Sequence, residues 1–427
     1  MPAKCAAPRA TAHLSQEYRT PAWEQRKLGE LYKEVSEKND LTYSRDRIIS
    51  VAHMYFNPVV YVTEDDYLKT YNVMRLGDIA FEGNRSKNFA HGRLVENTIG
   101  DGIVSHVFKV FRPIQPFDLM YWKYSINNEK AMKDVLTRST KASTMMHELV
   151  AKDFLNEEIA VPSLEEQRQI GAFFDRLDSL ITLHQRKYDR LCVLKKSMLD
   201  KMFPKGGSLY PEIRFAGFTD PWEQRKLGEV ASGFEYGLNA AASDFDGEKK
   251  YLRITDIDDQ TREFRTDDLS SPDINNPIDD RYLLKEGDIL FARTGASVGK
   301  TYLYKASDGK TYYAGFLIRA HVSDEADAGF IFQSTLTERY KQFVLLTSQR
   351  SGQPGINAQE YSDLLLPLPS LMEQRRIGAF FDRLDSLITL HQRKYDGCAN
   401  PLFLERRISC RKPSHQNRCS ATTTPSG

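Results

Sequence analysis

The chain has 427 residues, of which 41% are hydrophobic and 11% aromatic, so it can build its own cores and is not an intrinsically disordered protein. Its length predicts roughly two to four domains. The absence of a secretory signal and of an apolar run of about 18 residues predicts a cytoplasmic protein without a membrane span. With 59 Lys and Arg against 58 Asp and Glu, bulk charge gives no indication of nucleic-acid binding, which would have to depend on local basic surface.

The chain repeats itself once, and this is its most informative feature. Trp23–Glu30 returns as Trp222–Glu229, Gly77–Phe81 is closely matched by Gly287–Phe291, and Ile170–Asp189 returns without a change as Ile377–Asp396. Between these segments the two copies hardly match. A constant scaffold with variable inserts is what we expect of two reading domains that address two different targets.

After an atypical N-terminal tail (1–22), each variable region combines strand and helix patterns. Short apolar or alternating runs bounded by Gly, Asp and Pro predict strands, and helical stretches follow them. The strands are expected at Ile103–Phe111, Tyr251–Ile257, Asp288–Arg293 and Tyr312–Arg319, and the helices near Phe117–Leu136 and Phe330–Thr347. The predicted fold class is α+β, with two strand-rich domains at 23–160 and 222–368.

A long helix is predicted after each variable region. Ser163 and Ser370 each begin a Ser-x-x-Glu capping box directly after a proline, and apolar residues follow at heptad-like spacing. The central helix spans 161–204 and is followed by a linker (205–221), whereas the distal helix spans only 369–397 and precedes an atypical C-terminal tail (398–427). We expect the two apolar stripes to pack on each other. The residues expected in this pairing are Ile170, Phe173, Phe174, Leu177, Ile181, Tyr188, Leu191, Ile377, Phe380, Phe381, Leu384, Ile388 and Tyr395.

Two patterns imitate catalytic motifs. Gly295–Thr301 resembles a phosphate-binding loop, but it has three residues between its glycines where four are needed, so a tight turn is favoured. Pro272-Asp273 with Asp308-Gly309-Lys310 imitates a nuclease metal site, but the first copy has no counterpart and Asp308-Gly309 is itself a turn signal. A stand-alone nuclease or NTPase is therefore kept only as the alternative function, and a purely structural coiled-coil scaffold as a third.

The cysteines and histidines predict no metal centre. The five cysteines are odd in number and form no Cys-x-x-Cys pair, which is typical of free thiols in a reducing compartment. Cys410, His415 and Cys419 lie in a polar tail and lack the spacing of a zinc site. We expect neither a metal site nor a catalytic residue in this chain.

Polar loops rich in Arg, Lys, Asn and aromatic residues are the remaining candidates for function. Arg and Lys can bond to guanine edges, Asn and Gln to adenine edges, and Ser and Lys to phosphates. Such loops are often ordinary solvated surface, but their position in duplicated and otherwise divergent domains favours DNA binding. The candidate DNA-binding residues are Arg85, Lys87, His91, Arg93, Arg138 and Lys141 in the first copy, and Arg293, Thr294, Lys300, Thr301, Arg350 and Gln353 in the second.

The chain closely resembles the specificity subunits of type I restriction-modification systems. Trp-Glu-Gln-Arg-Lys-Leu-Gly-Glu opens each copy, Gly-Asp-Ile-x-Phe lies inside each, and Pro-x-Leu-x-Glu-Gln-Arg-x-Ile-Gly closes each. Arg293–Thr301 is also similar to a stretch common in the recognition domains of that family. The resemblance covers about residues 23–396.

This resemblance implies a non-catalytic, DNA-binding protein. Two target-recognition domains would alternate with two conserved helices that pair as an antiparallel coiled coil, and each domain would read one half of a bipartite site on double-stranded DNA. The helices would act as a ruler for the unread spacer and dock two modification (methyltransferase) subunits, and restriction subunits would complete the nuclease. No cofactor is expected in this chain, whereas S-adenosylmethionine, ATP and Mg are expected on the partner subunits.

The distal helix departs from the family pattern. After Asp396 the second copy reads Gly397-Cys-Ala-Asn-Pro401, where a continuation similar to Arg190–Lys196 is expected. Residues 1–20 likewise differ from Pro211–Phe218, which precede the second copy. We therefore expect part of the apolar stripe of the first helix to be exposed.

Overall fold

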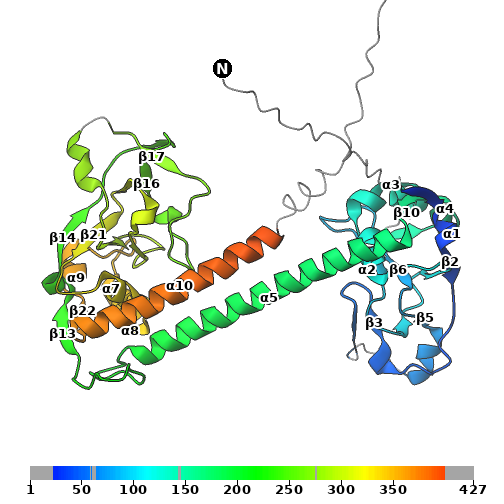
Figure 1. The fold of residues 1–427 in the computed structure, drawn as a ribbon, viewed down its shortest axis with the longest axis horizontal. Helices are drawn as coiled ribbons and strands as arrows, with labels where there is room; N and C mark the ends of the chain where they lie inside the picture. Colours follow the sequence, from blue (N-terminus) through cyan, green and yellow to red (C-terminus); the bar gives the residue numbers. More distant parts are fainter. Residues whose placement is uncertain (1–22, 58, 60–63, 143–145, 275–276, 400–427) are drawn as a thin grey trace, which may run out of the picture. The chain divides into compact units, whose positions relative to one another are not determined.

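The computed structural model describes residues 23–57, 59, 64–142, 146–274 and 277–399. The chain divides into two compact units, Met1–Ser179 and Leu180–Gly427. The long helix α5 (Leu164–Met202) contributes its first turns to unit 1 and its remaining turns to unit 2 (Figure 1). Each unit is therefore described separately.

Unit 1 is built on a four-stranded antiparallel sheet flanked by short helices. The sheet has the order β2 (Tyr32–Val35), β9 (Val110–Pro113), β6 (Ile79–Glu82), β7 (Arg93–Glu96). Smaller antiparallel pairs join β1 (Glu24–Lys27) to β12 (Glu158–Val161), β3 (Ile49–Ser50) to β4 (Tyr55–Phe56), β5 (Asn72–Met74) to β8 (Gly102–Val104) and β10 (Thr140–Ala142) to β11 (His147–Leu149). The helices are α1 (Leu28–Leu31), α2 (Leu119–Ile126), α3 (Glu129–Ser139) and α4 (Ala151–Asn156), with 3₁₀ turns at Arg45–Arg47 and Asp65–Thr70.

Unit 2 repeats this plan with a different sequence. Its four-stranded antiparallel sheet has the order β14 (Ala231–Tyr236), β21 (Leu317–Val322), β18 (Asp288–Ala292), β19 (Thr301–Leu303). Further pairs join β13 (Glu223–Lys226) to β22 (Leu365–Leu368), β15 (Ala242–Asp244) to β17 (Ser270–Pro272) and, in parallel, β16 (Lys250–Leu252) to β20 (Thr311–Tyr313). The helices are α6 (Leu227–Val230), α7 (Ala328–Ser334), α8 (Glu338–Thr347), α9 (Ala358–Ser362) and α10 (Leu371–Ala399), with 3₁₀ turns at Ile254–Asp256, Pro277–Tyr282 and Ala306–Asp308.

The repeated Gly-Asp-Ile-x-Phe segment forms the same turn into the same central strand in both units. Gly77 and Gly287 have positive φ angles of 84° and 89°, which glycine adopts without steric cost. The carboxylates of Asp78 and Asp288 are almost completely buried, and each accepts a backbone N–H from three residues earlier at 2.8 Å. This local requirement explains why the Gly-Asp pair is common to two domains whose sequences otherwise differ.

The predicted α+β class and the strand at Asp288–Arg293 are confirmed, but several runs contain more than one element. The predicted strand Ile103–Phe111 spans parts of β8 and β9, and Tyr312–Arg319 spans parts of β20 and β21. Each predicted helical stretch is a pair of helices, α2 with α3 and α7 with α8. The breaks coincide with local polar or glycine residues, such as Asn127-Asn128 between α2 and α3 and Gly315 between β20 and β21.

The start of each constant helix docks onto its own strand-rich domain. Asp118 caps α2 and Asp327 caps α7, and the backbone N–H of each donates to a glutamine Oε1 of the constant helix, at 3.2 Å for Gln167 and 3.1 Å for Gln374. At the helical glycine that follows, an added Cβ would lie only 2.3 Å from the capping Asp Oδ1 in both units. The Gln-Arg-x-Ile-Gly segment is thus a seat for a capped helix.

This docking corrects part of the predicted helix pairing. Ile170 packs against the core of unit 1, and Phe174 contacts Tyr124 of α2 with ring centroids 5.1 Å apart. Phe173 is 48% exposed. The contacts described for these residues are therefore made with their own domain, because the first turns of the helix serve to hold α2.

Within unit 2 the two long helices pair antiparallel, as predicted. Lys195 Nζ lies 2.6 Å from Asp385 Oδ1, and the Nδ1 atoms of His184 and His391 are 3.0 Å apart, so later residues of α5 meet earlier residues of α10. Figure 1 shows these turns of α5 beside α10. Predicted pairing residues of both helices belong to one hydrophobic core that also includes residues of the strand-rich domain: Tyr188 and Leu191 of α5, and Ile377, Phe380, Phe381, Leu384 and Ile388 of α10. Ile181 and Tyr395 are half-buried.

Candidate nucleic-acid interface

In each unit two connections that are far apart in sequence meet beside the central strand of the sheet. In unit 1 these are the β6–β7 connection and the β10–β11 hairpin, joined by the His147 N–H donating to Gly83 O at 2.9 Å. In unit 2 they are the β18–β19 connection and residues 348–356, joined by Gly295 N–H to Pro354 O at 3.0 Å and Ile356 N–H to Arg293 O at 2.9 Å. The duplicated fold therefore presents two equivalent loop pairs.

The loop pair of unit 1 gathers Arg85, His91 and His147. Arg85 Nε donates to His147 Nε2 at 2.8 Å, and the His91 ring stands edge-on to the His147 ring with centroids 5.1 Å apart. Burial, with the nearby Arg85 and His91, lowers the pKa of His147. Because Nε2 accepts the Arg85 proton, the neutral ring carries its own proton on Nδ1, which lies 3.4 Å from Thr140 Oγ1. His147 thus orients an exposed arginine.

The other candidates of unit 1 fall into two groups. Lys87 lies in the same connection as Arg85, Lys141 lies on β10 beside the hairpin, and both are exposed. Arg93 instead donates to Glu82 Oε2 at 2.7 Å and to Ala52 O at 2.6 Å, and Arg138 makes hydrogen bonds of 2.5–3.0 Å to Glu157. These two arginines are occupied by carboxylates of their own domain.

The loop pair of unit 2 combines an arginine, two aromatic rings and an amide. The Arg293 guanidinium lies over the Tyr236 ring at 4.8 Å from its centroid. Phe316, whose carbonyl accepts the Arg293 N–H, is 63% exposed. The backbone of Thr294 forms an isolated antiparallel β-bridge with Gly355, and the side chain of Gln353 lies against Gly295. Arginine, exposed aromatic rings and a primary amide are groups that stack on bases and bond to their edges.

Two candidates of unit 2 are corrected by their burial. Lys300 is 8% exposed, and its Nζ reaches Ile257 O at 2.7 Å and Asp259 Oδ1 at 2.6 Å. Thr301 is 1% exposed and shares a hydrogen bond of 2.7 Å with Thr335. Both side chains stabilise the β18–β19 hairpin from inside, so the sequence prediction that they contact DNA does not fit. Arg350 is held by Glu360 at 2.5 and 2.6 Å.

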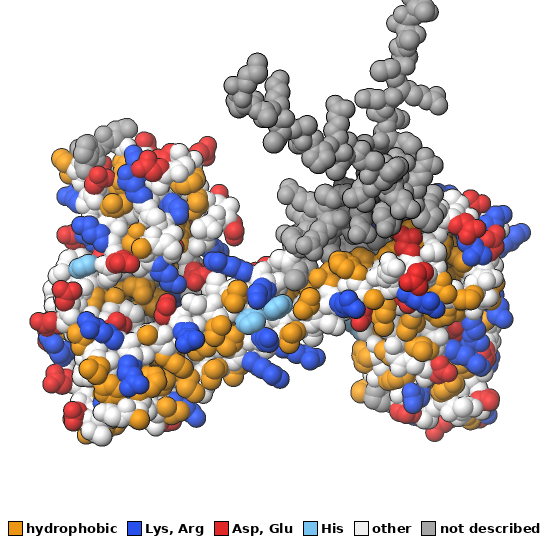
Figure 2. Space-filling model, viewed as in Figure 1, with side chains coloured by type: hydrophobic (Ala, Val, Ile, Leu, Met, Phe, Trp, Pro, Cys, Tyr) orange, Lys and Arg blue, Asp and Glu red, His pale blue; other side chains and the backbone are white. Residues whose placement is uncertain are grey.

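Sequence reasoning missed His147, Tyr236 and Phe316. Each comes from a segment distant from the basic loop that it supports, and the contact appears only when β-strands pair. The local sequence around these residues carries no basic cluster or motif that would single them out. Figure 2 shows acidic and basic side chains interspersed over the visible faces of both units.

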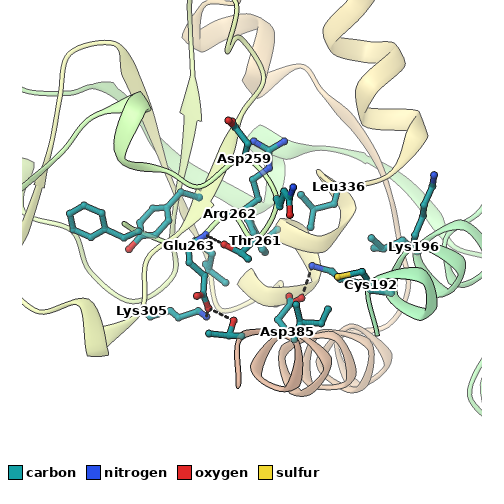
Figure 3. Close-up of a pocket in the computed structure, with 18 of the residues that line it drawn as sticks. Cys192, Lys196, Asp259, Thr261, Arg262, Glu263, Lys305, Leu336 and Asp385 are labelled. Carbon is teal, nitrogen blue, oxygen red and sulfur yellow. Dashed lines mark hydrogen bonds and ion pairs between the residues drawn. The ribbon is translucent and has the colours of Figure 1, made fainter. Parts of the chain in front are cut away.

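Unit 2 also contains a cavity of about 820 Å³ between recognition-domain loops and the paired helices (Figure 3). Tyr188 Oη donates to Gln260 Oε1 at 3.0 Å, Thr389 Oγ1 donates to Glu263 Oε1 at 3.1 Å, and the Lys195–Asp385 ion pair lies at the cavity edge. Burial lowers the pKa of Arg262, which lines the cavity with a positive φ of 61°. Acidic and basic side chains both line this cavity, and these two hydrogen bonds tie the strand-rich domain to the helices.

The imitation catalytic motifs are occupied by structural contacts. Tyr302 Oη donates to Asp308 Oδ2 at 2.5 Å, and Lys310 Nζ lies 3.0 Å from Glu248 Oε1. Across the described residues, no group of three or more His, Cys, Asp or Glu side chains could hold a metal ion. None of the described helices combines the length and apolarity needed to cross a membrane. Cys410, His415 and Cys419 lie outside the described residues.

Comparisons with known proteins agree with the duplicated architecture. A family model described as the type I restriction modification DNA specificity domain matches residues 22–192 and again 219–397. The specificity subunit of the type I restriction enzyme MjaVIII from Methanocaldococcus jannaschii is 26% identical over 364 residues, covering 82% of this chain and 80% of that protein. The crystal structure of a type I restriction-modification S subunit from M. genitalium superposes with a TM-score of 0.53 at 13% identity, covering 94% of this chain and 99% of that one.

Proposed function

Since the chain belongs to the family of type I restriction-modification DNA specificity domains, with one copy in each half, we propose that it reads a bipartite target on double-stranded DNA and carries no catalytic step. Residues 23–160 would read one half of the target and residues 222–368 the other. The paired helices would set the spacing between the two halves. The chain would act in the cytoplasm as the specificity subunit of a restriction and modification complex.

The observation that carries this proposal is the same loop pair with different side chains. The loop pair of unit 1 gathers Arg85, His91 and His147, whereas the loop pair of unit 2 combines Arg293 and Gln353 with Tyr236 of β14. Arginine forks bond to guanine O6 and N7, and a glutamine amide bonds to adenine N6 and N7. Two equivalent loop pairs with different side chains suit two half-sites with different sequences.

The catalytic chemistry would belong to partner subunits. Two modification subunits docked on the helices would bind S-adenosylmethionine, flip a target adenine out of the duplex and methylate it. Restriction subunits would supply ATP- and Mg-dependent cleavage. This chain would then hold none of these cofactors and would contribute only the recognition of the target sequence.

Methylation mapping tests the proposal. The chain is co-expressed with its cognate modification subunit, and methylated adenines are located across the host genome. We expect methylation at one split motif only when this chain is present. Methylation that is independent of the chain would contradict the proposal, and DNA cleavage or ATP hydrolysis by the isolated chain would favour a stand-alone nuclease or NTPase.

A further inference from the structure

In unit 2 the first turns of α10 are covered by the chain that follows α5, which we call the closing segment (residues 202–222). Arg214 donates two hydrogen bonds of 2.7 Å to the carboxylate of Glu373, which is completely buried. Phe203 stacks on Phe330 of α7 with ring centroids 5.2 Å apart, and Trp222 is only 1% exposed. The closing segment thus seals the junction between the helix and its recognition domain.

The closing segment also covers the next turn of α10. The guanidinium of Arg376 lies over the rings of Phe215 and Phe218, 5.1 and 5.6 Å from their centroids. Phe215 contacts Phe380 with ring centroids 6.1 Å apart. The Arg-Phe-x-x-Phe run of this segment therefore contacts both an acidic and an aromatic side chain of the helix.

Unit 1 presents the matching side chains without such a cover among its described residues. Trp23, Glu166 and Phe173 stand at the positions of Trp222, Glu373 and Phe380. Trp23 is 45% and Phe173 48% exposed, and the Glu166 carboxylate accepts the Trp23 indole N–H at 3.1 Å where Glu373 binds an arginine. A pocket of about 410 Å³ lies here, lined by Trp23, Trp122 and Glu166 among others.

The sequence explains why the two units differ. In unit 2 the closing segment directly follows the last turns of α5, which also contact α10 through the ion pair of Lys195 with Asp385. After Asp396 the chain continues as Gly397–Pro401 and does not repeat Arg190–Lys196, and the residues before Trp23 do not repeat Arg214–Phe218. The described residues therefore include two seats of this kind and one closing segment.

We propose that unit 1 is a docking site for a closing segment supplied by a second polypeptide. The occupant would be an amphipathic helix that ends in Met-Phe-Pro and is followed by an Arg-Phe pair, the chemistry of residues 190–218. Its arginine would pair with Glu166, because the equivalent carboxylate in unit 2 binds Arg214. Its phenylalanines would cover Trp23 and Phe173, whose counterparts in unit 2 are covered by Phe203 and Phe215.

Peptide binding to the full chain tests this docking. A fluorescein-labelled peptide of residues 190–218 is titrated with the purified chain, and anisotropy is recorded. We expect saturable binding that weakens at least about tenfold when the peptide carries R214E or the chain carries Glu166→Arg, since either change leaves a charge without its partner. Combining the R214E peptide with the E166R chain should restore the affinity to within about threefold.

A neighbouring glutamate provides the matched control. Glu165 lies one residue away, is 71% exposed and pairs with Arg168 at 3.7 Å, so Glu165→Arg should leave peptide binding unchanged. Absence of saturable binding, equal loss in E165R and E166R, or failure of the charge exchange to restore affinity would each overturn the proposal. Loss of modification-subunit binding in E166R without an effect on the peptide would assign the surface to that subunit and overturn it as well. The readout needs no DNA, so its failure would leave the proposed DNA reading intact.

Discussion

The candidate DNA-binding arginines share one chemical type but fall into two groups in the structure, according to whether they contact an uncharged side chain or a carboxylate. Arg85 and Arg293 are supported by a neutral histidine and a tyrosine ring, so their positive charge is not neutralised. Arg93 of β7 meets Glu82 of β6, and Arg138 of α3 meets Glu157 at the end of α4. The sequence could predict that these loops are basic, but it could not predict this division, because each partner lies on another element of the fold.

The two kinds of arginine in unit 2 should differ in their effect on target reading. Arg293→Ala should lower the preference for the correct half-sequence over a single-mismatch site by about 1–3 kcal/mol, because an exposed base-reading group is lost. Arg350→Ala is the control, since Arg350 is held by Glu360. The measurement is the methylated fraction at matched and single-mismatch sites. Equal effects of the two variants would remove Arg293 from the interface.

A buried carboxyl group should make the stability of unit 1 depend on pH. Burial, and then the charge of Asp118, raises the pKa of Glu96 from 4.5 to about 9, and neither oxygen has a hydrogen-bond partner in the described part of the chain. The folded state therefore holds a proton that the unfolded state releases between these two values. The stabilisation of unit 1 by this bound proton is fully present below pH 4.5 and is lost as pH rises through about 9. The free energy of unfolding falls by at most about 1.4 kcal/mol per pH unit in this range.

The variant Glu96→Gln should remove this pH dependence. Denaturant unfolding at pH 6 and pH 9, followed by tryptophan fluorescence, measures it because Trp122 lies in the core of unit 1. Glu158→Gln changes an exposed glutamate on β12 and serves as the control. If E96Q and the wild-type chain lose the same stability between the two pH values, Glu96 is not the responsible group.

At the scale of elements, the sequence predicted the long helices well and their first turns poorly. The capping boxes and heptad spacing located α5 and α10 to within a few residues, and the expected exposure of the stripe agrees with Phe173 and Leu180, which are 48% and 47% exposed. Heptad spacing could not show that Ile170 packs against its own domain. That contact depends on Asp118, which lies outside any periodic pattern, so only the fold reveals it.

Two glycines of α10 should respond in opposite directions to alanine. At Gly378 an added Cβ would lie 2.3 Å from Asp327 Oδ1 and 3.1 Å from Phe330 N, so Gly378→Ala should destabilise unit 2 by about 1–3 kcal/mol. At Gly397 nothing lies within 4 Å, so Gly397→Ala should have no cost or should stabilise the helix by up to about 1 kcal/mol. Thermal unfolding of both variants measures the difference. A neutral G378A would show that the helix seat is not tightly packed.

At the scale of the whole molecule, duplication is the feature that the sequence conveys most completely. Three repeated segments predicted two domains and two helices, and both units have the same strand order around the same central strand. The variable regions could not be predicted in detail, because their loops are shaped by contacts between distant segments. The proposed function rests on this contrast between a repeated frame and its differing loop pairs.

The most direct test replaces the first strand-rich domain by a copy of the second. A chain in which residues 23–160 are replaced by a second copy of residues 222–368 is co-expressed with the modification subunit, and methylated adenines are mapped. The account predicts that the half-sequence read by residues 222–368 is retained and appears a second time, inverted, in place of the other half. An unchanged motif, or a motif altered in both halves, would contradict independent reading by the two domains.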